Sequence, residues 1–183
     1  RGRFPDNPFI LNRLGWLLVH QGRREQGRSL CEQAVDQYFD GRPPISNSVP
    51  LRLPFRGGWR VAQGTDSRPT HFGLEQKYAL DFARVDGRGR YHRGDGRKLA
   101  DYYSFGAEIL APADGTVDEA IDIHPDVSPT NLFEVTAPPN QITLRVARSE
   151  WVKITHLKQG SLRVKPGEQV RRGQVIAECG NSG

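Results

Sequence analysis

Two side chains of metal-binding type, His71 and Asp81, lie in the first half of this 183-residue sequence, with nine residues between them. His71 follows a polar, proline-containing loop, residues 64–70, and Asp81 lies inside the apolar run YALDF, residues 78–82. Imidazole nitrogens and carboxylate oxygens bind zinc, but a zinc site needs at least three protein ligands. A carboxylate among apolar side chains is costly unless it is paired or bound to a metal. The pair therefore predicts either two ligands of a zinc site or a structural salt bridge.

A third candidate, His156, ends the segment VKITH, residues 152–156. The alternation of a β-strand would place Val152, Ile154 and His156 on one face. Taken alone, this pattern indicates a core histidine with satisfied hydrogen bonds. Next to a metal site, the same position suits a histidine that takes part in catalysis. The other histidines are interpreted as surface residues: His20, His92 and His124.

The elements that must position these residues are mostly short strands. With 20 glycines and 13 prolines, the composition favours turns between short strands over long helices. From residue 51 onward we predict an antiparallel sheet or sandwich. Its expected strands are residues 51–55, 59–62, 78–84, 108–111, 115–120, 132–136, 141–147, 151–157 and 174–179. Residues 86–103 and 123–129 are predicted loops, and the sequence closes on the loop GNSG, residues 180–183.

Residues 8–39 are predicted to form a small helical hairpin, because apolar residues recur there at spacings of three and four. The hairpin resembles one tetratricopeptide repeat, with Leu14, Gly15, Leu18, Gly27 and Ala34 at that motif's spacing. Such repeats need about three copies to bury a stable core. Either other repeats precede it, or it packs on the segment that follows. A generic helical hairpin is the alternative, and either form offers helices to a protein partner.

Several motifs of the second region occur in a specific order: APADGTV at residues 111–117, THL at 155–157, VKPGEQVRRGQVI at 164–176 and GNSG at 180–183. Preceded by His71 and Asp81, this series resembles peptidase family M23, the lysostaphin and LytM-like zinc endopeptidases. The resemblance covers residues 51–183. It implies two regions, a hairpin with its linker at 1–45 and a LytM-like peptidase domain at 51–183 that is incomplete at its C-terminal end.

The resemblance also implies a site. It assigns His71 and Asp81 as zinc ligands and His156 as the residue that assists catalysis. The family's third ligand comes from a His-x-His pair beyond the glycine loop, and this sequence contains no such pair. The family often has three residues between the first two ligands, where this chain has nine. The implied reaction is zinc-dependent cleavage of peptide cross-links in bacterial peptidoglycan. Activity of this exact chain stays open because the third ligand is missing.

Charge and targeting signals limit the classes of partner. The net charge of +5 comes from scattered arginines. Their densest cluster, residues 84–98, is rich in glycine and interrupted by Asp86 and Asp95. This pattern indicates a solvated loop, so we expect no nucleic-acid partner. The longest apolar run, residues 16–19, is too short to span a bilayer. No targeting segment is visible and the sequence has no methionine, which indicates a processed or trimmed product. The resemblance places the protein in the cell envelope, periplasmic or secreted.

Three other functions stay open. A degenerate member of the same family would bind or regulate cell-wall hydrolases without cleaving. A biotinyl or lipoyl carrier domain shares the valine-glycine hairpin pattern but needs a lysine at a tight turn, and the sequence lacks one. A helical-repeat scaffold would place the function in residues 8–39. The residues beyond Gly183 would separate the first of these from a peptidase.

Overall fold

The computed structural model describes residues 7–40, 46–64, 71, 73–130 and 138–183. The chain divides into two compact units. One comprises Arg1–Ile45 with Val61–Phe82, and the other comprises Ser46–Arg60 with Ala83–Gly183. No helix within the described ranges is long and apolar enough to cross a membrane.

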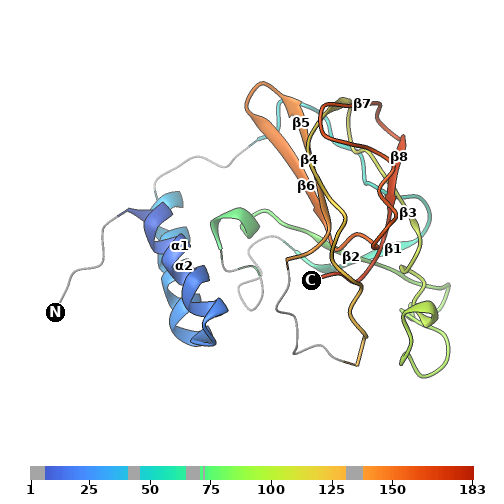
Figure 1. Ribbon diagram of the computed structural model, residues 1–183, viewed down its shortest axis with the longest axis horizontal. Helices are drawn as coiled ribbons and strands as arrows, with labels where there is room; N and C mark the ends of the chain where they lie inside the picture. The colour runs from blue at the N-terminus through green and yellow to red at the C-terminus, as the bar shows by residue number, and fades with distance from the viewer. Residues whose placement is uncertain (1–6, 41–45, 65–70, 72, 131–137) are drawn as a thin grey trace. The chain divides into compact units, whose positions relative to one another are not determined.

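The first unit contains the predicted helical hairpin, α1 (Pro8–His20) and α2 (Arg24–Phe39) (Figure 1). The side chain of Asn7 caps α1 by accepting hydrogen bonds from the backbone N–H groups of Phe9 and Ile10, at 2.9 and 3.3 Å. The helices meet at two glycines. A Cβ on Gly15 would lie 2.6 Å from the carbonyl oxygen of Gly27, and a Cβ on Gly27 would lie 2.4 Å from the carbonyl oxygen of Gly15. Only glycine allows this close crossing.

The hairpin also packs on the segment that follows His71. Asn12 accepts a hydrogen bond from the backbone N–H of Leu74 at 3.1 Å and donates one to the Glu75 carboxylate at 2.9 Å. The rings of Phe39 and Tyr78 meet edge to face, with centroids 5.6 Å apart. Of the two alternatives for a lone hairpin, the structure therefore shows packing on later residues. The resemblance to a tetratricopeptide repeat stays a prediction.

This packing explains why the strand expected at 78–84 is shorter. Leu74–Gln76 forms a 3₁₀ helix, η1, and the backbone N–H of Ala79 donates to the carbonyl of Gln76 at 2.9 Å. The strand β2 begins only at Asp81 and runs over Asp81–Arg84. It belongs to a two-stranded sheet with β1 (Trp59–Gln63).

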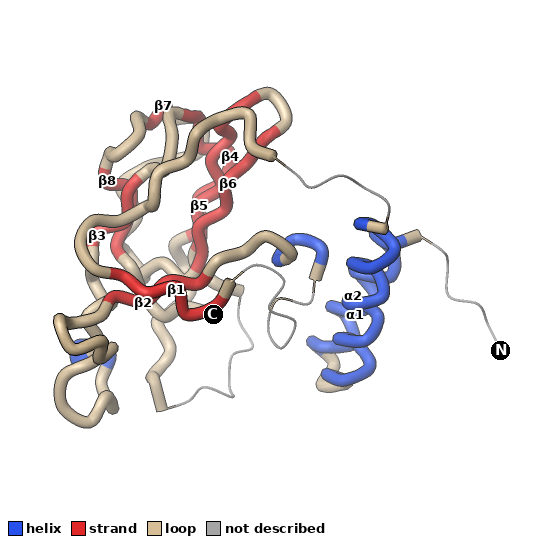
Figure 2. The backbone as a smooth tube through the Cα atoms, turned by 180° about the vertical axis from the view of Figure 1, so that it is seen from behind, coloured by secondary structure: helices blue, strands red, loops and turns tan. Residues whose placement is uncertain are grey.

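The second unit is built from two further sheets. β3 (Glu108–Leu110) pairs with β8 (Val175–Glu178) in an antiparallel manner. The other sheet has the order β6-β5-β4-β7 and is antiparallel at each pairing. The strands of both sheets are drawn in red in Figure 2. Its strands are β4 (Gly115–Ile121), β5 (Gln141–Ala147), β6 (Glu150–Thr155) and β7 (Gln169–Val170). The prediction of a mainly β, antiparallel fold with an N-terminal helical hairpin is confirmed.

One core joins these two sheets, as a sandwich-like arrangement requires. Ile109 and Ile176 come from the β3–β8 sheet, and Val117, Ile142 and Leu144 come from the four-stranded sheet. All five are at most 5 % exposed. The alternating pattern of β5 produces this burial, because Ile142 and Leu144 point inward while their neighbours point to the other face.

Two strand predictions had other outcomes, and one observed strand was not predicted. Residues 51–55 form no strand, although the backbone N–H of Arg52 donates to Pro112 and that of Leu110 donates to Pro54. The prolines at 50 and 54 lack the N–H groups that a regular ladder needs. The two-residue strand β7 was not predicted. The strand expected at 132–136 lies outside the described residues.

The arginine-rich stretch at residues 84–98, called the basic loop below, is exposed, as predicted. The side chains of its cationic residues reach solvent: Arg84, Arg88, Arg90, Arg93, Arg97 and Lys98. Asp86 organises its first turn by accepting hydrogen bonds from the backbone N–H groups of Arg88 and Arg90, at 2.9 and 3.0 Å. These bonds and the Arg90 guanidinium lower the pKa of Asp86 to about 2. The loop is therefore held by a carboxylate that stays ionised in ordinary buffers.

Candidate functional site

The structure brings the first two predicted ligands together within the first unit. The Nε2 atom of His71 lies 3.2 Å from Oδ1 of Asp81. The His71 side chain is 5 % exposed, whereas that of Asp81 is 48 % exposed. Asp81 is the first residue of β2, so its carboxylate lies at a strand end. A buried imidazole thus meets a carboxylate that remains open to solvent on one side.

The second nitrogen of His71 limits what this contact can be. Nδ1 lies 3.2 Å from the carbonyl oxygen of Gly64, and because a carbonyl only accepts, Nδ1 must carry a proton. In a neutral imidazole, Nε2 is then an acceptor and faces the acceptor oxygen of Asp81. Two acceptors at this distance need a proton or a cation between them. The pair is either an imidazolium–carboxylate ion pair or two ligands of one metal ion.

The geometry of the pair fits zinc. Two ligand atoms at about 2.0–2.1 Å from a tetrahedral ion lie about 3.3 Å apart, close to the observed 3.2 Å. The carbonyl of Gly64 would act as the outer partner that fixes the ring orientation of a metal-binding histidine. Within the described ranges, however, no three His, Cys, Asp or Glu side chains gather into a metal-binding group. His71 and Asp81 can therefore supply two ligands, and a third is needed from elsewhere.

His156 lies in the second unit and does not continue β6. The strand ends at Thr155, and His156 is the one non-glycine residue in the described part of the chain with a positive φ, 60°. Its side chain is exposed, whereas Val152 and Ile154 are partly buried. The prediction that His156 shares their face is wrong, because the left-handed backbone turns the residue out of the alternation. Such a conformation costs about 1–3 kcal/mol and persists only where surrounding contacts impose it.

The imidazole of His156 is held by the last residues of the chain. Its Nδ1 lies 2.8 Å from the carbonyl oxygen of Ser182, so Nδ1 carries the proton. In the neutral ring, Nε2 is then left as an acceptor, the form that binds a metal or takes up a proton. The carbonyl of His156 itself accepts a hydrogen bond from the backbone N–H of Gly180 at 2.9 Å.

A buried polar network holds both Ser182 and Leu157, the residue that follows His156. Asn140 and Ser182 are 0 % exposed. The amide of Asn140 donates to the carbonyls of His124 and Leu157, at 2.7 and 3.2 Å, and accepts from the backbone N–H of His124 at 2.8 Å. The Ser182 hydroxyl donates to the carbonyl of Leu157 at 2.7 Å and accepts from the backbone N–H of Asn140 at 3.0 Å. The residue after His156 is thus bound on two sides.

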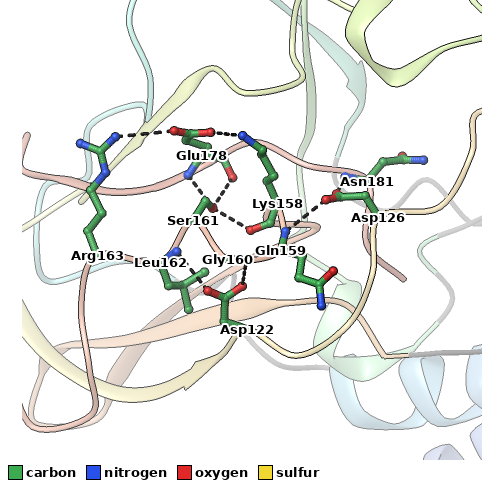
Figure 3. A network of polar contacts seen from close by, with 10 residues as sticks. All are labelled: Asp122, Asp126, Lys158, Gln159, Gly160, Ser161, Leu162, Arg163, Glu178 and Asn181. Carbon is green, nitrogen blue, oxygen red and sulfur yellow. Dashed lines mark hydrogen bonds and ion pairs between the residues drawn. The ribbon is translucent and has the colours of Figure 1, made fainter.

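Two aspartates, Asp122 and Asp126, also hold the turn that follows His156 (Figure 3). Asp126 accepts hydrogen bonds from the backbone N–H groups of Asn181 and Gln159, at 2.6 and 3.1 Å. Asp122 accepts one from the backbone N–H of Gly160 at 2.7 Å. Asp126 therefore ties the turn after His156 to Asn181, and Asp122 holds the same turn at Gly160. The GNSG segment is therefore part of the packed structure, although its sequence indicates only a loop.

Glycine is required where this segment begins. A Cβ on Gly180 would lie 2.3 Å from both the Cα and the N of Lys158, and 2.5 Å from a carboxylate oxygen of Asp126. These atoms belong to backbone or to a hydrogen-bonded side chain, so they cannot easily move away. The close approach allows Gly180 to hydrogen-bond to His156.

Sequence reasoning found His71, Asp81 and His156 but missed the residues that hold His156. Asn140 follows two prolines at a strand start, where an asparagine normally indicates a turn. Ser182 stands in a glycine-rich tail. Neither has a neighbour in the sequence that indicates burial, because their partners lie 16 to 42 positions away.

No protein-family model and no curated protein matches this sequence. Among solved structures, the chain is similar to a crystal structure described as a "putative peptidase M23 from pseudomonas aeruginosa", with 20 % identity and a TM-score of 0.43. The match covers 77 % of this chain and 42 % of that chain, so this sequence spans less than half of the matched protein's length.

Proposed function

We propose that this chain is part of a zinc-dependent endopeptidase of the M23 type that cleaves peptide cross-links in bacterial peptidoglycan. One observation carries the proposal. Nε2 of His71 and Oδ1 of Asp81 lie 3.2 Å apart while Nδ1 of His71 is committed to a backbone carbonyl. With a neutral imidazole these atoms are two facing acceptors, and a metal ion between them would satisfy both. The order of the motifs from APADGTV to GNSG supports the same assignment.

The candidate residues would have two roles, metal binding and proton transfer. His71 and Asp81 would hold the ion, which lowers the pKa of a bound water and polarises a scissile carbonyl. Ser182 keeps the proton of His156 on Nδ1, so Nε2 can accept a proton from a reacting group. The imidazolium so formed can return that proton to the leaving amine. Because His156 is exposed, the proton can be exchanged with a substrate that approaches from solvent.

The substrate and the compartment follow from the same proposal. Peptidoglycan lies outside the cytoplasmic membrane, so the protein would work in the cell envelope, periplasmic or secreted. The helical hairpin is proposed to contact a protein partner. Helix α1 exposes three large apolar side chains, Phe9, Ile10 and Leu17, at 49–62 % of their full area.

A non-catalytic module that binds or regulates cell-wall hydrolases is the second candidate. It is favoured by the absence of a group of three metal-binding side chains in the described part of the chain. In that case the contact between His71 and Asp81 would be an ion pair with a structural role in the first unit. The two candidates differ in metal content and in catalysis, and both can be measured on the same protein.

The test compares zinc content and hydrolysis in three proteins that include any residues following Gly183. We expect the wild type to bind about one zinc per chain and to cleave cross-linked muropeptides. Asp81→Ala should lose both properties, because it removes a ligand. The matched control is Asp95→Ala, which removes an exposed carboxylate of the basic loop, 68 % accessible, and should change neither.

Other outcomes are equally informative. A folded wild type that binds purified peptidoglycan without zinc and without cleavage would establish the non-catalytic module. Zinc binding that survives both Asp81→Ala and His71→Ala would show that the ion lies elsewhere, which would overturn the proposed site.

A further inference from the structure

The four-stranded sheet presents a polar face opposite to its core. On β5, Ile142 and Leu144 point inward, so the odd-numbered residues lie on the outer face. The strand register places Arg145 opposite Trp151, and Thr143 opposite Lys153. We call this face the Trp151 platform, and its central residues are Asp118, Glu119, Thr143, Arg145, Trp151 and Lys153.

A bulge in β4 directs a carboxylate to this platform. Val117 pairs with Leu144 and Glu119 pairs with Thr143, so Asp118 is an extra residue between two regular pairs. Its Oδ2 accepts a hydrogen bond from the indole Nε1–H of Trp151 at 2.7 Å, and its Oδ1 lies 3.2 Å from Nε of Arg145. Bulges often re-aim a side chain near a functional site.

The indole is consequently both fixed and accessible. Trp151 is 52 % exposed although it is the largest side chain of the platform. Its one polar atom is already paired, so the ring offers an apolar surface held in one orientation. A fixed aromatic ring binds with little loss of conformational entropy.

Other hydrogen-bonding groups belong to the same sheet. Glu119 accepts from the side chains of Gln141 and Thr143. Further along, the amide of Gln169 donates to the hydroxyl of Thr116 at 2.9 Å. An open hollow of about 340 Å³ lies beside this end of the sheet and is lined by Thr116, Arg145 and Arg148 among others. The face thus combines a fixed aromatic ring with amide, hydroxyl and carboxylate groups, and an open hollow adjoins it at Arg145.

The charge of the platform selects the kind of ligand. Asp118 and Glu119 balance Arg145 and Lys153, so the central residues carry no net charge. A polyanion such as nucleic acid gains its affinity from an excess of cations, which these central residues do not have. A neutral chain of sugars has an apolar ring face for the indole and many hydroxyl groups for the polar side chains.

We propose that the Trp151 platform binds a polysaccharide strand, with one sugar ring on the indole and the neighbouring hydroxyl groups on Asp118, Arg145 and the hollow. This site lies entirely in the second unit and needs no metal. It goes beyond the proposed peptidase function, and it would hold the polymer independently of any bond cleavage.

The test uses the full chain and the hexasaccharide of β-1,4-linked N-acetylglucosamine, followed by the indole N–H signals in NMR. Titration should shift the Trp151 signal and leave those of Trp16 and Trp59 unmoved. Trp151→Ala should weaken binding about tenfold or more, equivalent to about 1.4 kcal/mol. Trp151→Phe, which keeps a ring, should recover part of the loss. Unchanged circular dichroism spectra would exclude misfolding of the variants.

His71→Ala separates this proposal from the peptidase function, because it should leave saccharide binding unchanged while it removes a proposed zinc ligand. Three results would overturn the platform: no shift of the Trp151 signal at millimolar saccharide, equal affinity in Trp151→Ala, or stronger binding of a sulfated hexasaccharide than of the neutral one.

Discussion

The two groups of candidate residues, one in each unit, are held in opposite ways. His71 and Asp81 meet through one contact, and one of the two side chains is half exposed. His156 leaves a strand in a left-handed conformation. Its carbonyl accepts a hydrogen bond from Gly180, its imidazole contacts the carbonyl of Ser182, and Asn140 holds the next residue, Leu157. The first arrangement needs a cation or a proton to be stable, whereas the second is imposed by the fold. A metal should therefore change the first region and leave the second almost unaltered.

The largest effect should come from Asn140→Ala. The substitution leaves the N–H and the carbonyl of His124 without their buried partner, and each such loss costs about 1–3 kcal/mol. We expect the free energy of unfolding of the second unit to fall by about 3 kcal/mol in urea denaturation. Gln169→Ala, which removes an exposed amide, should change it by less than about 0.5 kcal/mol. A loss below 1 kcal/mol for Asn140→Ala would mean that the network does not hold His156.

Gly180→Ala should have the next largest effect, because its methyl group would overlap the backbone of Lys158. Overpacking of this kind costs about 1–3 kcal/mol. The matched control is Gly87→Ala in the basic loop. A Cβ there meets no atom within 4 Å and the φ is ordinary, so this change should be neutral or slightly stabilising. Equal melting temperatures for the two variants would contradict the close approach.

Asp81→Asn should have the smallest effect when metal is absent. The carboxylate is half exposed, and pairs open to solvent contribute about 0–1 kcal/mol. Saturating zinc should raise the melting temperature of the wild type and not that of the variant, because a ligand stabilises only the state that binds it. If Asp81→Asn without metal destabilised the protein as strongly as Asn140→Ala, the two regions would not differ in the way described.

Much of the fold could be predicted because its strands obey simple alternation. The bounds of β5 were predicted correctly from QITLRVA, and the helical hairpin at 8–39 was predicted from apolar spacing. The late start of β2 could not be predicted, because the contacts of Asn12 with residues 74 and 75 override strand propensity. The strand β7 has only two residues, too few for any pattern.

The candidate metal-binding and catalytic residues could be predicted from their types, but the residues that hold His156 in place could not. Asp81 was identified because a carboxylate stands in an apolar run, and its predicted pairing with His71 is present in the structure. The orientation of His156 depends on Ser182 and Asn140, which are distant in sequence and resemble ordinary loop residues. Left-handed backbone at a histidine has no signal in the sequence, because it arises from tertiary hydrogen bonds.

The bulge at Asp118 has a consequence for how this surface can change during evolution. Leu144 and Thr143 are consecutive on β5, whereas their partners Val117 and Glu119 are separated by one residue. Loss of the single codon for Asp118 would bring those partners together and preserve the strand pairing on both sides. A lineage could therefore discard or regain the carboxylate beneath Trp151 in one step while the core stays the same.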